Sequence, residues 1–401
     1  MTCLALKHRN GCSMIKTKIY DQFHCIADQC PLTCCKGWAI RADGGIYETW
    51  KSRTETSYLC EQVTYNREDG ENIYHMKLDS CKACVLLDEK GLCEIVKRHG
   101  DEFLSDTCAR FPRKHNQITI FSEEDAEEKN VMDEYSLSGA CPAALKLIRD
   151  SKDFYIVDIP EKCRDNHDFP MEYQVRNAVI RLMQKRKFSL TDRLMLSFSL
   201  LHECLSCEWE DEVYDCIAVY QEEENLVDTL SMWQHTTYDR KEAFIEVCET
   251  WLDVTVFYKE EAMYQPYLKE LFDFVEKTDE EEEKLSMLLT DWKSFTADWA
   301  GYDTYWENIL VSEIFADCIS EDIEYLMEAF QSIMMEYIMT RVTVFMKQEM
   351  SKEAITEEKL YEYASLFIRM IGHNTEGMAE YWEENFDDSI LDKEYFYLLL
   401  Q

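Results

Sequence analysis

The chain has 401 residues, a net charge of −38 and 46% hydrophobic residues, so it can bury a sizeable core and is not a disordered tail. Its excess of negative charge repels nucleic acid and anionic membranes, and we expect neither as a partner. With only 11 Gly and 6 Pro, the chain should have few turns and long elements, which favours a mainly helical fold.

The first segment, residues 1–17, is polar and basic and is expected to form a loose N-terminal extension. It lacks the apolar stretch of a secretion signal. No later stretch approaches the roughly 18 apolar residues that span a bilayer. We therefore expect a cytoplasmic protein, in which thiols stay reduced and clustered cysteines bind metal more often than they form disulfides.

Residues 18–145 are expected to form a loop-rich, cysteine-rich metal-binding domain packed on a helical body. Nine of its ten cysteines, all except Cys60, are candidate metal ligands: Cys25, Cys30, Cys34, Cys35, Cys81, Cys84, Cys93, Cys108 and Cys141. Several lie two to four residues apart, a spacing that lets thiolates reach one metal. Four thiolates also form the usual ligand set of an iron–sulfur cluster. Nine thiols exceed that need, so either two metal sites exist or some thiols are spectators.

Residues 146–401 are expected to form an acidic, all-helical domain. Residues 1–120 carry 17 Lys+Arg and 16 Asp+Glu, which leaves 25 and 64 for the rest of the chain. Ser189 or Thr191 is available to cap a helix that begins near Leu190. Further amphipathic runs cover 242–258, 262–277, 284–300, 305–317, 321–349, 357–372 and 376–384. The acidic surface keeps these helices soluble, and it could also attract a basic, lysine-bearing protein.

Cys204 and Cys207 also have the spacing of metal ligands. They lie in an apolar run that is predicted to be helical, where cysteines three residues apart are more often core neighbours. We therefore leave them out of the predicted metal site.

The cysteine motifs resemble those of the flagellin lysine-N-methylase (FliB-like) family. The matching segments are Gln22-Phe23-His24-Cys25-x4-Cys30-x3-Cys34-Cys35-x-Gly37-Trp38, Gly91-Leu92-Cys93-Glu94-Ile95, Leu104-Ser105-Asp106-Thr107-Cys108-x-x-Phe111-Pro112-Arg113 and Ser138-Gly139-Ala140-Cys141-Pro142. The last segment has two more residues between serine and cysteine than the family's element. Similar helical signatures follow in order: Arg176 with Ser189-Leu190-x-x-Arg193-Leu194, Tyr305-x-Glu307-Asn308-x-Leu310-Val311, and Arg369-x-x-x-His373-Asn374.

This resemblance implies a protein-lysine N-methyltransferase that uses S-adenosylmethionine, acts on flagellin and contains an iron–sulfur cluster, expected to be of the 4Fe–4S type. The sequence shows neither a Gly-x-Gly-x-x-Gly turn nor the Cys-x3-Cys-x2-Cys triad of radical enzymes. Where the methyl donor binds, and whether the cluster takes part in chemistry, therefore stays open.

The matched motifs supply the candidate site residues. Trp38 could stack on a substrate or cap the cluster, and Arg113 could pair with the carboxylate of the methyl donor. Arg369 and His373, four residues apart on one helix face, and Glu307 and Asn308 are the candidate catalytic residues, because a lysine must lose its proton before it attacks a methyl group. The alternative for these four is a polar network that packs helices together.

The alternative function is a non-enzymatic iron–sulfur or zinc protein that senses redox state or handles metal. A broader group of zinc- or iron-chelating cysteine-cluster proteins shares only Cys34-Cys35, Cys84, Cys93 and Cys108-x-x-Phe111-Pro112 with this chain. Zinc is accordingly the alternative metal.

Overall fold

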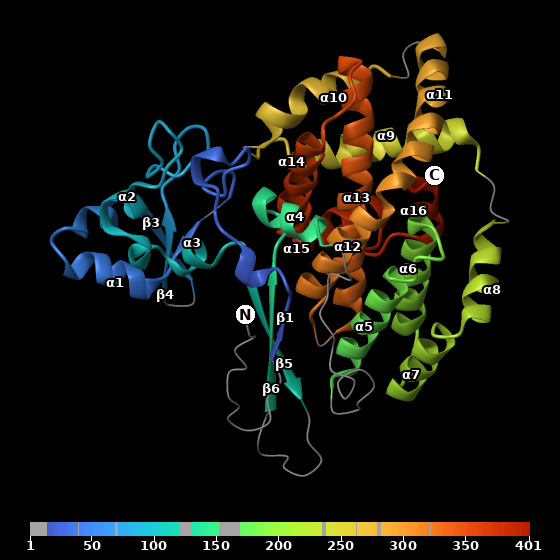
Figure 1. Ribbon diagram of the computed structural model, residues 1–401, viewed down its shortest axis with the longest axis horizontal. Coiled ribbons are helices and arrows are strands. Elements are labelled where there is room, and N and C mark those ends of the chain that lie inside the picture. Colours follow the sequence, from blue (N-terminus) through green and yellow to red (C-terminus); the bar gives the residue numbers. More distant parts are fainter. Residues whose placement is uncertain are drawn as a thin grey trace.

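The structure is a computed structural model, and it describes residues 14–38, 40–68, 71–120, 130–151, 169–234, 238–261, 263–278, 282–320 and 322–401. Most of the expected N-terminal extension, with Cys3 and Cys12, lies outside these residues. Figure 1 shows a small unit beside a larger helical body, with a sheet between them.

The small unit combines a three-stranded antiparallel sheet with three short helices. Its strands are β2 (Arg41–Ala42), β3 (Val63–Glu68) and β4 (Glu71–Met76), in the order β2-β4-β3, and its helices are α1 (Gly44–Ser52), α2 (Glu94–His99) and α3 (Asp106–Arg110). The Asp43 carboxylate accepts a hydrogen bond from the Ile46 amide and so caps α1. Nine buried apolar residues between Ile40 and Phe103 form its core, and Trp50 donates to the Phe103 carbonyl across it.

The second sheet joins distant parts of the chain. β1 (Met14–Lys16) lies parallel to β6 (Asn130–Leu137), and β5 (Arg113–Ile120) lies antiparallel to β6, with Arg113 opposite Leu137. Ile118, Met132 and Leu137 of this sheet belong to the core of the helical body. The larger core thus reaches into residues 18–145, the part of the chain assigned above to the cysteine-rich domain.

The helical body follows. Its helices are α4 (Pro142–Arg149), α5 (Met171–Met183), α6 (Leu190–Leu205), α7 (Glu210–Val219), α8 (Glu223–Gln234), α9 (Arg240–Phe257), α10 (Lys269–Val275), α11 (Glu282–Trp299), α12 (Asp303–Asp317), α13 (Ile323–Ser351), α14 (Glu357–Phe367), α15 (Thr375–Phe386) and α16 (Lys393–Leu399), with π-helical turns at Tyr264–Leu268 and Ile368–Gly372. The predicted mainly helical fold is confirmed. The predicted helical runs match helices to within a few residues, whereas α4, α7, α8 and α16 were not predicted.

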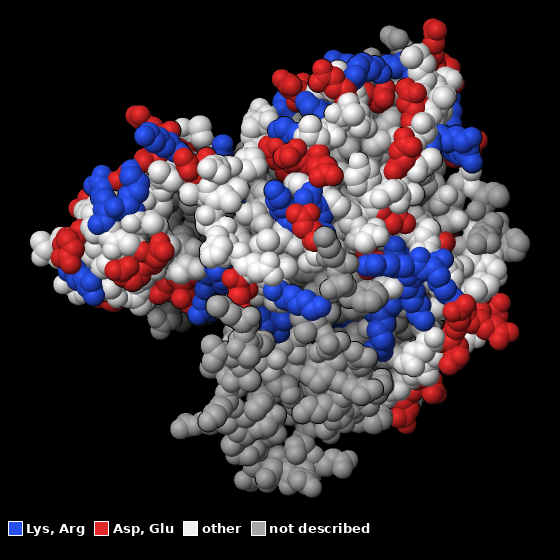
Figure 2. All heavy atoms as spheres, viewed as in Figure 1, with Lys and Arg blue, Asp and Glu red and all other residues white. Residues whose placement is uncertain are grey.

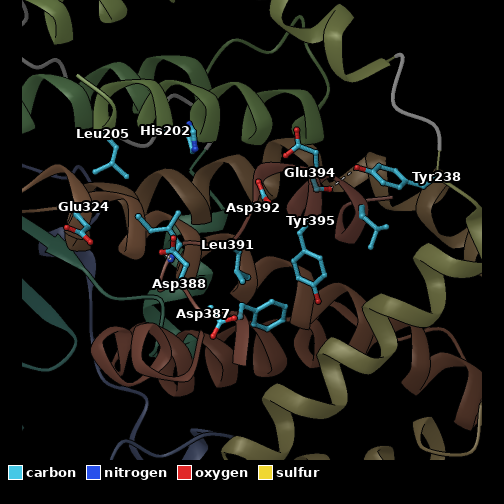
Figure 3. Close-up of a pocket in the computed structure, with 13 residues that line it drawn as sticks. His202, Leu205, Tyr238, Glu324, Asp387, Asp388, Leu391, Asp392, Glu394 and Tyr395 are labelled. Atoms are coloured by element: carbon cyan, nitrogen blue, oxygen red, sulfur yellow. Dashed lines mark hydrogen bonds between the residues drawn. The ribbon is translucent and has the colours of Figure 1, made fainter. Parts of the chain in front are cut away.

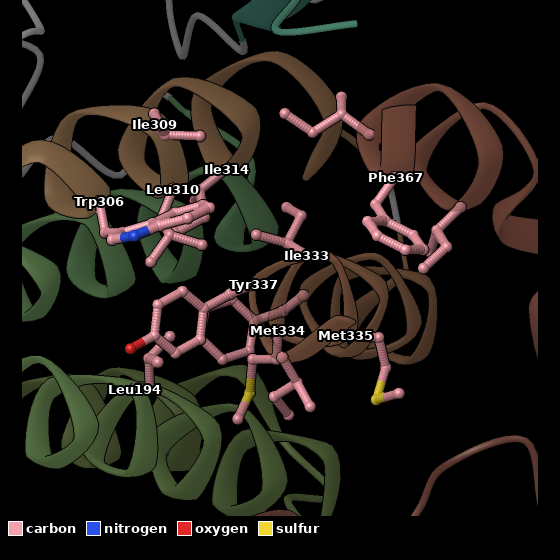
Figure 4. Close-up of a cluster of buried hydrophobic side chains, with 14 of the residues drawn as sticks. Leu194, Trp306, Ile309, Leu310, Ile314, Ile333, Met334, Met335, Tyr337 and Phe367 are labelled. Carbon is pink, nitrogen blue, oxygen red and sulfur yellow. The ribbon is translucent and has the colours of Figure 1, made fainter. Parts of the chain in front are cut away.

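The central helix is α13, which is buried on all its faces from Leu326 to Met346 apart from Glu328. Side chains from three neighbouring helices converge on it (Figure 4): Leu194 from α6, Leu310 from α12 and Phe367 from α14. The predicted cap of α6 is also confirmed, because Ser189 and Asp192 form a reciprocal capping box.

Charged side chains of both signs are interspersed on the face shown in Figure 2, with acidic ones gathered over α7 and α8. Within the described part of the chain, no helix has both the length and the apolarity needed to cross a membrane.

Candidate functional site

Four of the predicted metal ligands come together in the small unit although they lie on separate segments. The Cys84 amide donates to the Cys35 carbonyl (2.8 Å), and Cys93 forms a backbone bridge with Leu87, three residues after Cys84. The Cys108 thiol interacts electrostatically with the thiols of Cys84 and Cys93. Cys35, Cys84, Cys93 and Cys108 therefore form one group of thiols, which packs on the small core.

A second group of thiols lies against the helical body. The Cys141 thiol interacts with those of Cys30 and Cys34, and the exposed Cys25 lies beside Cys30. The two groups meet at the vicinal pair, because the thiols of Cys34 and Cys35 are hydrogen-bonded to each other. Vicinal cysteines thus face different partners.

Cys81, the remaining predicted ligand, is exposed in the turn that precedes Cys84. Its backbone amide donates to the Asp79 side chain (2.8 Å).

The donor chemistry of these groups fits a metal that prefers sulfur. Both groups offer only thiols near one another, as zinc and iron–sulfur sites require. Burial raises the pKa of Cys108 and of Cys141 to about 11, whereas the hydrogen bond from Cys35 lowers the pKa of Cys34 to about 7. In the described residues, no three His, Cys, Asp or Glu side chains are arranged closely enough to coordinate an ion. The choice of ligands and of metal stays a prediction.

Arg369 fastens the second thiol group to the helical body. This buried side chain extends from the π-helical turn Ile368–Gly372 and donates to the carbonyls of Leu32 (3.0 Å), Thr33 (2.8 Å) and Ala140 (2.9 Å). Its charge interacts favourably with the thiols of Cys30, Cys34 and Cys141. The contacts are those of a residue that positions the cysteine loops, and a catalytic role for Arg369 remains a prediction.

The segment Ser138–Pro142 is held from three sides. Gly139 donates its amide to the Glu313 carboxylate (2.9 Å) and accepts a hydrogen bond from the Ser365 hydroxyl (2.8 Å), while Arg369 holds Ala140. A Cβ atom at position 139 would lie 2.8 Å from the Glu313 oxygen, so only glycine allows this approach. Side chains of α12 and α14 thereby fix the position of Cys141.

Trp38 and His373 come together, which sequence reasoning did not foresee. Their rings lie 5.8 Å apart, and Phe111 lies within 6.3 Å of His373. The Trp38 indole donates to the Cys34 carbonyl, so the three rings adjoin the thiol groups. Part of the His373 side chain is exposed, but protein atoms surround much of its ring. The loss of hydration and the positive charge of nearby Lys114 together lower the pKa of His373 to about 4. Its imidazole is therefore neutral at pH 7.

Arg113, the other predicted cofactor-binding residue, lies over the rings of Tyr20 and Phe23, and it donates to the Phe23 carbonyl (3.3 Å). It thus fastens the segment that leads to Cys25. Its predicted contact with a methyl donor stays a prediction.

Glu307 and Asn308 lie on α12, and their contacts are those of residues that pack helices together. The fully buried Glu307 carboxylate accepts hydrogen bonds from Arg186 (2.8 Å) and Arg193 (2.6 Å), and so joins α12 to the turn after α5 and to α6. The Asn308 amide donates to the carbonyls of Arg149 and Ser151 at the end of α4. These contacts match the packing alternative, and their role in catalysis stays a prediction.

A cluster of charged residues beside His373 was missed by sequence reasoning. It comprises Glu313 and Asp317 of α12, Glu336 of α13 and Lys114 of β5, and we call it the acidic cluster. Glu313 and Glu336 are buried, whereas Lys114 and Asp317 are half-buried and form an ion pair. The available signal was a lone carboxylate inside an otherwise apolar helical run, as in Ile333-Met334-Met335-Glu336-Tyr337-Ile338.

Two further features lie apart from this junction. Cys204 is buried, as expected of a core neighbour, while Cys207 lies 3.7 Å from the thiol of Cys216 on α7. A cavity of about 1000 Å³ opens between α6, α13 and α16 (Figure 3), with Glu324, Asp388 and Asp392 among its acidic lining residues. None of the predicted catalytic, cofactor or metal-binding residues lines that cavity.

Comparison with known proteins identifies the family. Residues 176–399, more than half of the chain, match the FliB lysine N-methylase C-terminal domain. The chain belongs to the FliB lysine N-methylase family. The predicted family is confirmed, and its enzyme class is that of a protein-lysine methyltransferase. The match covers α5 to α16 and includes Arg369, His373, Glu313 and Glu336.

Individual FliB relatives match a shorter part of the chain. The chain is 30% identical over 135 residues to the flagellar biosynthetic protein FliU of Salmonella muenchen, which covers 33% of this chain and 73% of that protein. It is 29% identical over 136 residues to a lysine-N-methylase of Salmonella typhimurium, and 30% identical over 135 residues to one of Salmonella choleraesuis. It spans about a third of the length of these two lysine-N-methylases (31% each). No solved structure matches the chain.

Proposed function

We propose that this protein transfers methyl groups from S-adenosylmethionine to lysines of flagellin, and that it contains an iron–sulfur cluster. The observation that carries the proposal is the family match over residues 176–399, which places the helical half of the junction within a lysine N-methylase domain. The names of the relatives, a flagellar biosynthetic protein and lysine-N-methylases, support flagellin as the substrate.

The thiols supply the ligands for the cluster. Cys35, Cys84, Cys93 and Cys108 form the primary ligand set, because the last three pack on one small core and the Cys35 thiol interacts with those of Cys84 and Cys108. Cys30, Cys34 and Cys141 would serve a second site. A bound cluster would cross-link these segments, so it would supply much of the folding free energy of the small unit. Clustered thiols of this kind support a location in the cytoplasm, where thiols stay reduced.

The junction of the two halves is where we place methyl transfer. Trp38 from the small unit, Phe111 from the segment before β5 and His373 after the π-helical turn form a ring-lined surface there. A lysine ammonium must lose a proton before its nitrogen can attack the methyl carbon of a sulfonium. His373, neutral and exposed, is one group at this surface that can accept a proton.

The decisive experiment is to incubate anaerobically purified protein with flagellin and S-adenosylmethionine labelled in its methyl group. Labelled methyl-lysine in flagellin, identified by mass spectrometry of its peptides, is the expected result. Flagellin incubated with heat-inactivated protein is the control. If active, metal-loaded protein leaves flagellin unlabelled, flagellin methylation is wrong and the non-enzymatic alternative takes its place.

Metal analysis of the same preparation tests the cofactor separately. The protein should be brown and contain iron and acid-labile sulfide, because thiolate clusters of these elements absorb visible light. Colourless protein with stoichiometric zinc would falsify the iron–sulfur assignment and leave the methyltransferase proposal untouched.

A further inference from the structure

The acidic cluster at the junction holds three carboxyl groups and one cation. Lys114 is ion-paired with Asp317 and also interacts with Glu313 and Glu336, so the last two have no ion pair of their own among the described residues. Both side chains are buried, with 2% and 4% of their surface exposed. Buried carboxylates are normally paired with a cation or hydrogen-bonded on both oxygens, because their loss of hydration is costly.

Glu336 is the member of the acidic cluster that most clearly lacks a partner. Its Oε1 atom is buried and has no hydrogen-bond partner in the described part of the structure. That atom lies against Gly372, where a Cβ atom would collide with it. Gly372 directly precedes His373, so the unpartnered oxygen lies next to the ring-lined surface of Trp38, Phe111 and His373.

The side chains around these carboxyl groups differ in their exposure. Trp38, Phe111, Lys114 and Asp317 are half-buried, and His373 is exposed, while Glu313 and Glu336 are buried. Aromatic faces attract cations, so the rings favour the same kind of ligand as the carboxylates. A long aliphatic chain that ends in a single positive charge has the chemistry for this arrangement.

We infer that the acidic cluster is the receptor for the substrate lysine: its alkyl chain lies along Trp38, Phe111 and His373, and its ammonium group replaces the missing cation beside Glu336 and Glu313. This inference rests on the proposed function, since it names the part of the site that accepts the protein substrate. Lys114 forms its ion pair with Asp317, so the entering ammonium meets the carboxyl groups of Glu313 and Glu336, which have no ion pair of their own among the described residues.

The same residues account for the proton that the reaction releases. A carboxylate of Glu336 or Glu313 takes one proton from the lysine ammonium, which leaves a neutral amine and a carboxylic acid. The amine lone pair then forms a bond to the methyl carbon, the carbon–sulfur bond breaks, and its electrons stay on sulfur as the neutral thioether. The product is a methylated ammonium group, whose positive charge the remaining carboxylate stabilises. Burial raises the pKa of Glu313 to about 8, so this group binds a proton readily and is in part a carboxylate near pH 8.

The kinetic test compares Glu336→Gln and Glu313→Gln with the control Glu328→Gln. Glutamine keeps the shape and one acceptor oxygen, removes the charge and has an NH2 donor in place of the second oxygen. Glu328 lies on the same helix as Glu336, two turns earlier. We expect both cluster variants to lose at least tenfold in kcat/KM for flagellin while the KM for S-adenosylmethionine stays unchanged and the control matches the parent protein. A rise in the KM for S-adenosylmethionine alone would assign the cluster to the sulfonium, and wild-type kinetics in both variants would remove it from the site; either result overturns the inference.

A binding test separates this inference from flagellin methylation itself. Thermal unfolding of the metal-loaded protein is followed with Nα-acetyl-lysine methylamide, and with the norleucine analogue, which lacks the ammonium group. The lysine probe should raise the midpoint in the parent protein and in Glu328→Gln, but not in Glu336→Gln, and the norleucine probe should have no effect. This result can be obtained even if flagellin is not methylated. Equal shifts with both probes, or no shift with the lysine probe at high concentration, would show that no ammonium receptor exists.

Discussion

Helix α12 carries two buried acidic sites that differ in charge balance. Near its start, Glu307 is paired with Arg186 and Arg193, so one carboxylate meets two cations. Near its end, Glu313 and Asp317 share Lys114 with Glu336 of α13, so three carboxylates meet one cation. The first site is in the interior of the helical body, and the second adjoins the thiol groups and the exposed His373.

The difference separates a packing network from a functional one. A balanced, hydrogen-bonded network can hold helices in register without a ligand. An unbalanced one costs folding free energy, and such exceptions to good packing are found mainly where function requires them. We therefore place the proposed lysine receptor at the second site, and the catalytic role of Glu307 stays a prediction.

The largest effect on stability should come from breaking the balanced network. Arg193 has only 2% of its side chain exposed, so Arg193→Ala leaves the Glu307 charge buried with a partner that is 41% exposed, Arg186. We expect a loss of about 3–5 kcal/mol in the free energy of unfolding. Arg186→Ala is the matched control and should cost less, because water can replace its guanidinium. Urea unfolding of both variants measures the difference, and equal losses would contradict the assignment of Arg193 as the principal partner.

The next effect concerns the link between the two halves of the molecule. Arg369→Ala removes three hydrogen bonds to backbone carbonyls of the cysteine loops. Bonds from a charged group contribute about 1.5–3 kcal/mol each at most, and part of this loss is recovered by water, so we expect about 2–3 kcal/mol overall. Bound metal should become easier to remove by a chelator, while the helical content in circular dichroism persists. A variant that keeps its metal as tightly as the parent would show that Arg369 does not position the thiols.

The sequence predicts those features of the structure that leave a local pattern in the chain, such as the periodicity and the caps of helices. Period and capping residues predicted most helices, including the Ser189 cap, because α6 and its neighbours bury one face against α13. α7 and α8 were missed since they are short and largely exposed, with few buried positions to set a period.

Only part of the candidate site could be predicted from the sequence, for a similar reason. Cysteine spacing marked Cys35, Cys84, Cys93 and Cys108, which the fold does bring together. Local spacing could not reveal that Trp38 meets His373, or that Glu313 and Glu336 come from two helices to one point, because those contacts join segments far apart in the chain.

An effect of opposite sign is expected from the unbalanced cluster. Burial raises the pKa of Glu313 from its ordinary 4.5 to about 8, so between these values the folded protein holds a proton that the unfolded chain has released. Stability contributed by this proton is complete below pH 4.5 and is lost as the pH rises toward 8, with a slope of up to about 1.4 kcal/mol per pH unit. Glu313→Gln has no proton to lose.

This variant should therefore be more stable than the parent protein at pH 8 and similar to it at pH 5. Chemical unfolding at both values measures the effect, with Glu328→Gln as the control. A Glu313→Gln protein that is less stable than the parent at pH 8 would mean that its charge is compensated, and the contrast with Glu307 would disappear.

The smallest change in stability is expected at His373, and it tests whether the ring-lined surface has a role in turnover. Because the side chain is exposed and makes only ring contacts with Trp38 and Phe111, His373→Ala should alter the free energy of unfolding by about 0.5 kcal/mol or less. Its metal content should not change, since His373 belongs to neither thiol group.

If the ring helps to align the substrate lysine, methyl transfer should nevertheless fall, with a higher KM for flagellin, and His373→Phe should restore binding because it keeps a flat ring. If the imidazole instead accepts the proton, His373→Phe should remain as slow as His373→Ala in kcat. A stable His373→Ala protein with unchanged turnover would exclude both roles and leave Glu313 and Glu336 as the proton acceptors at this junction.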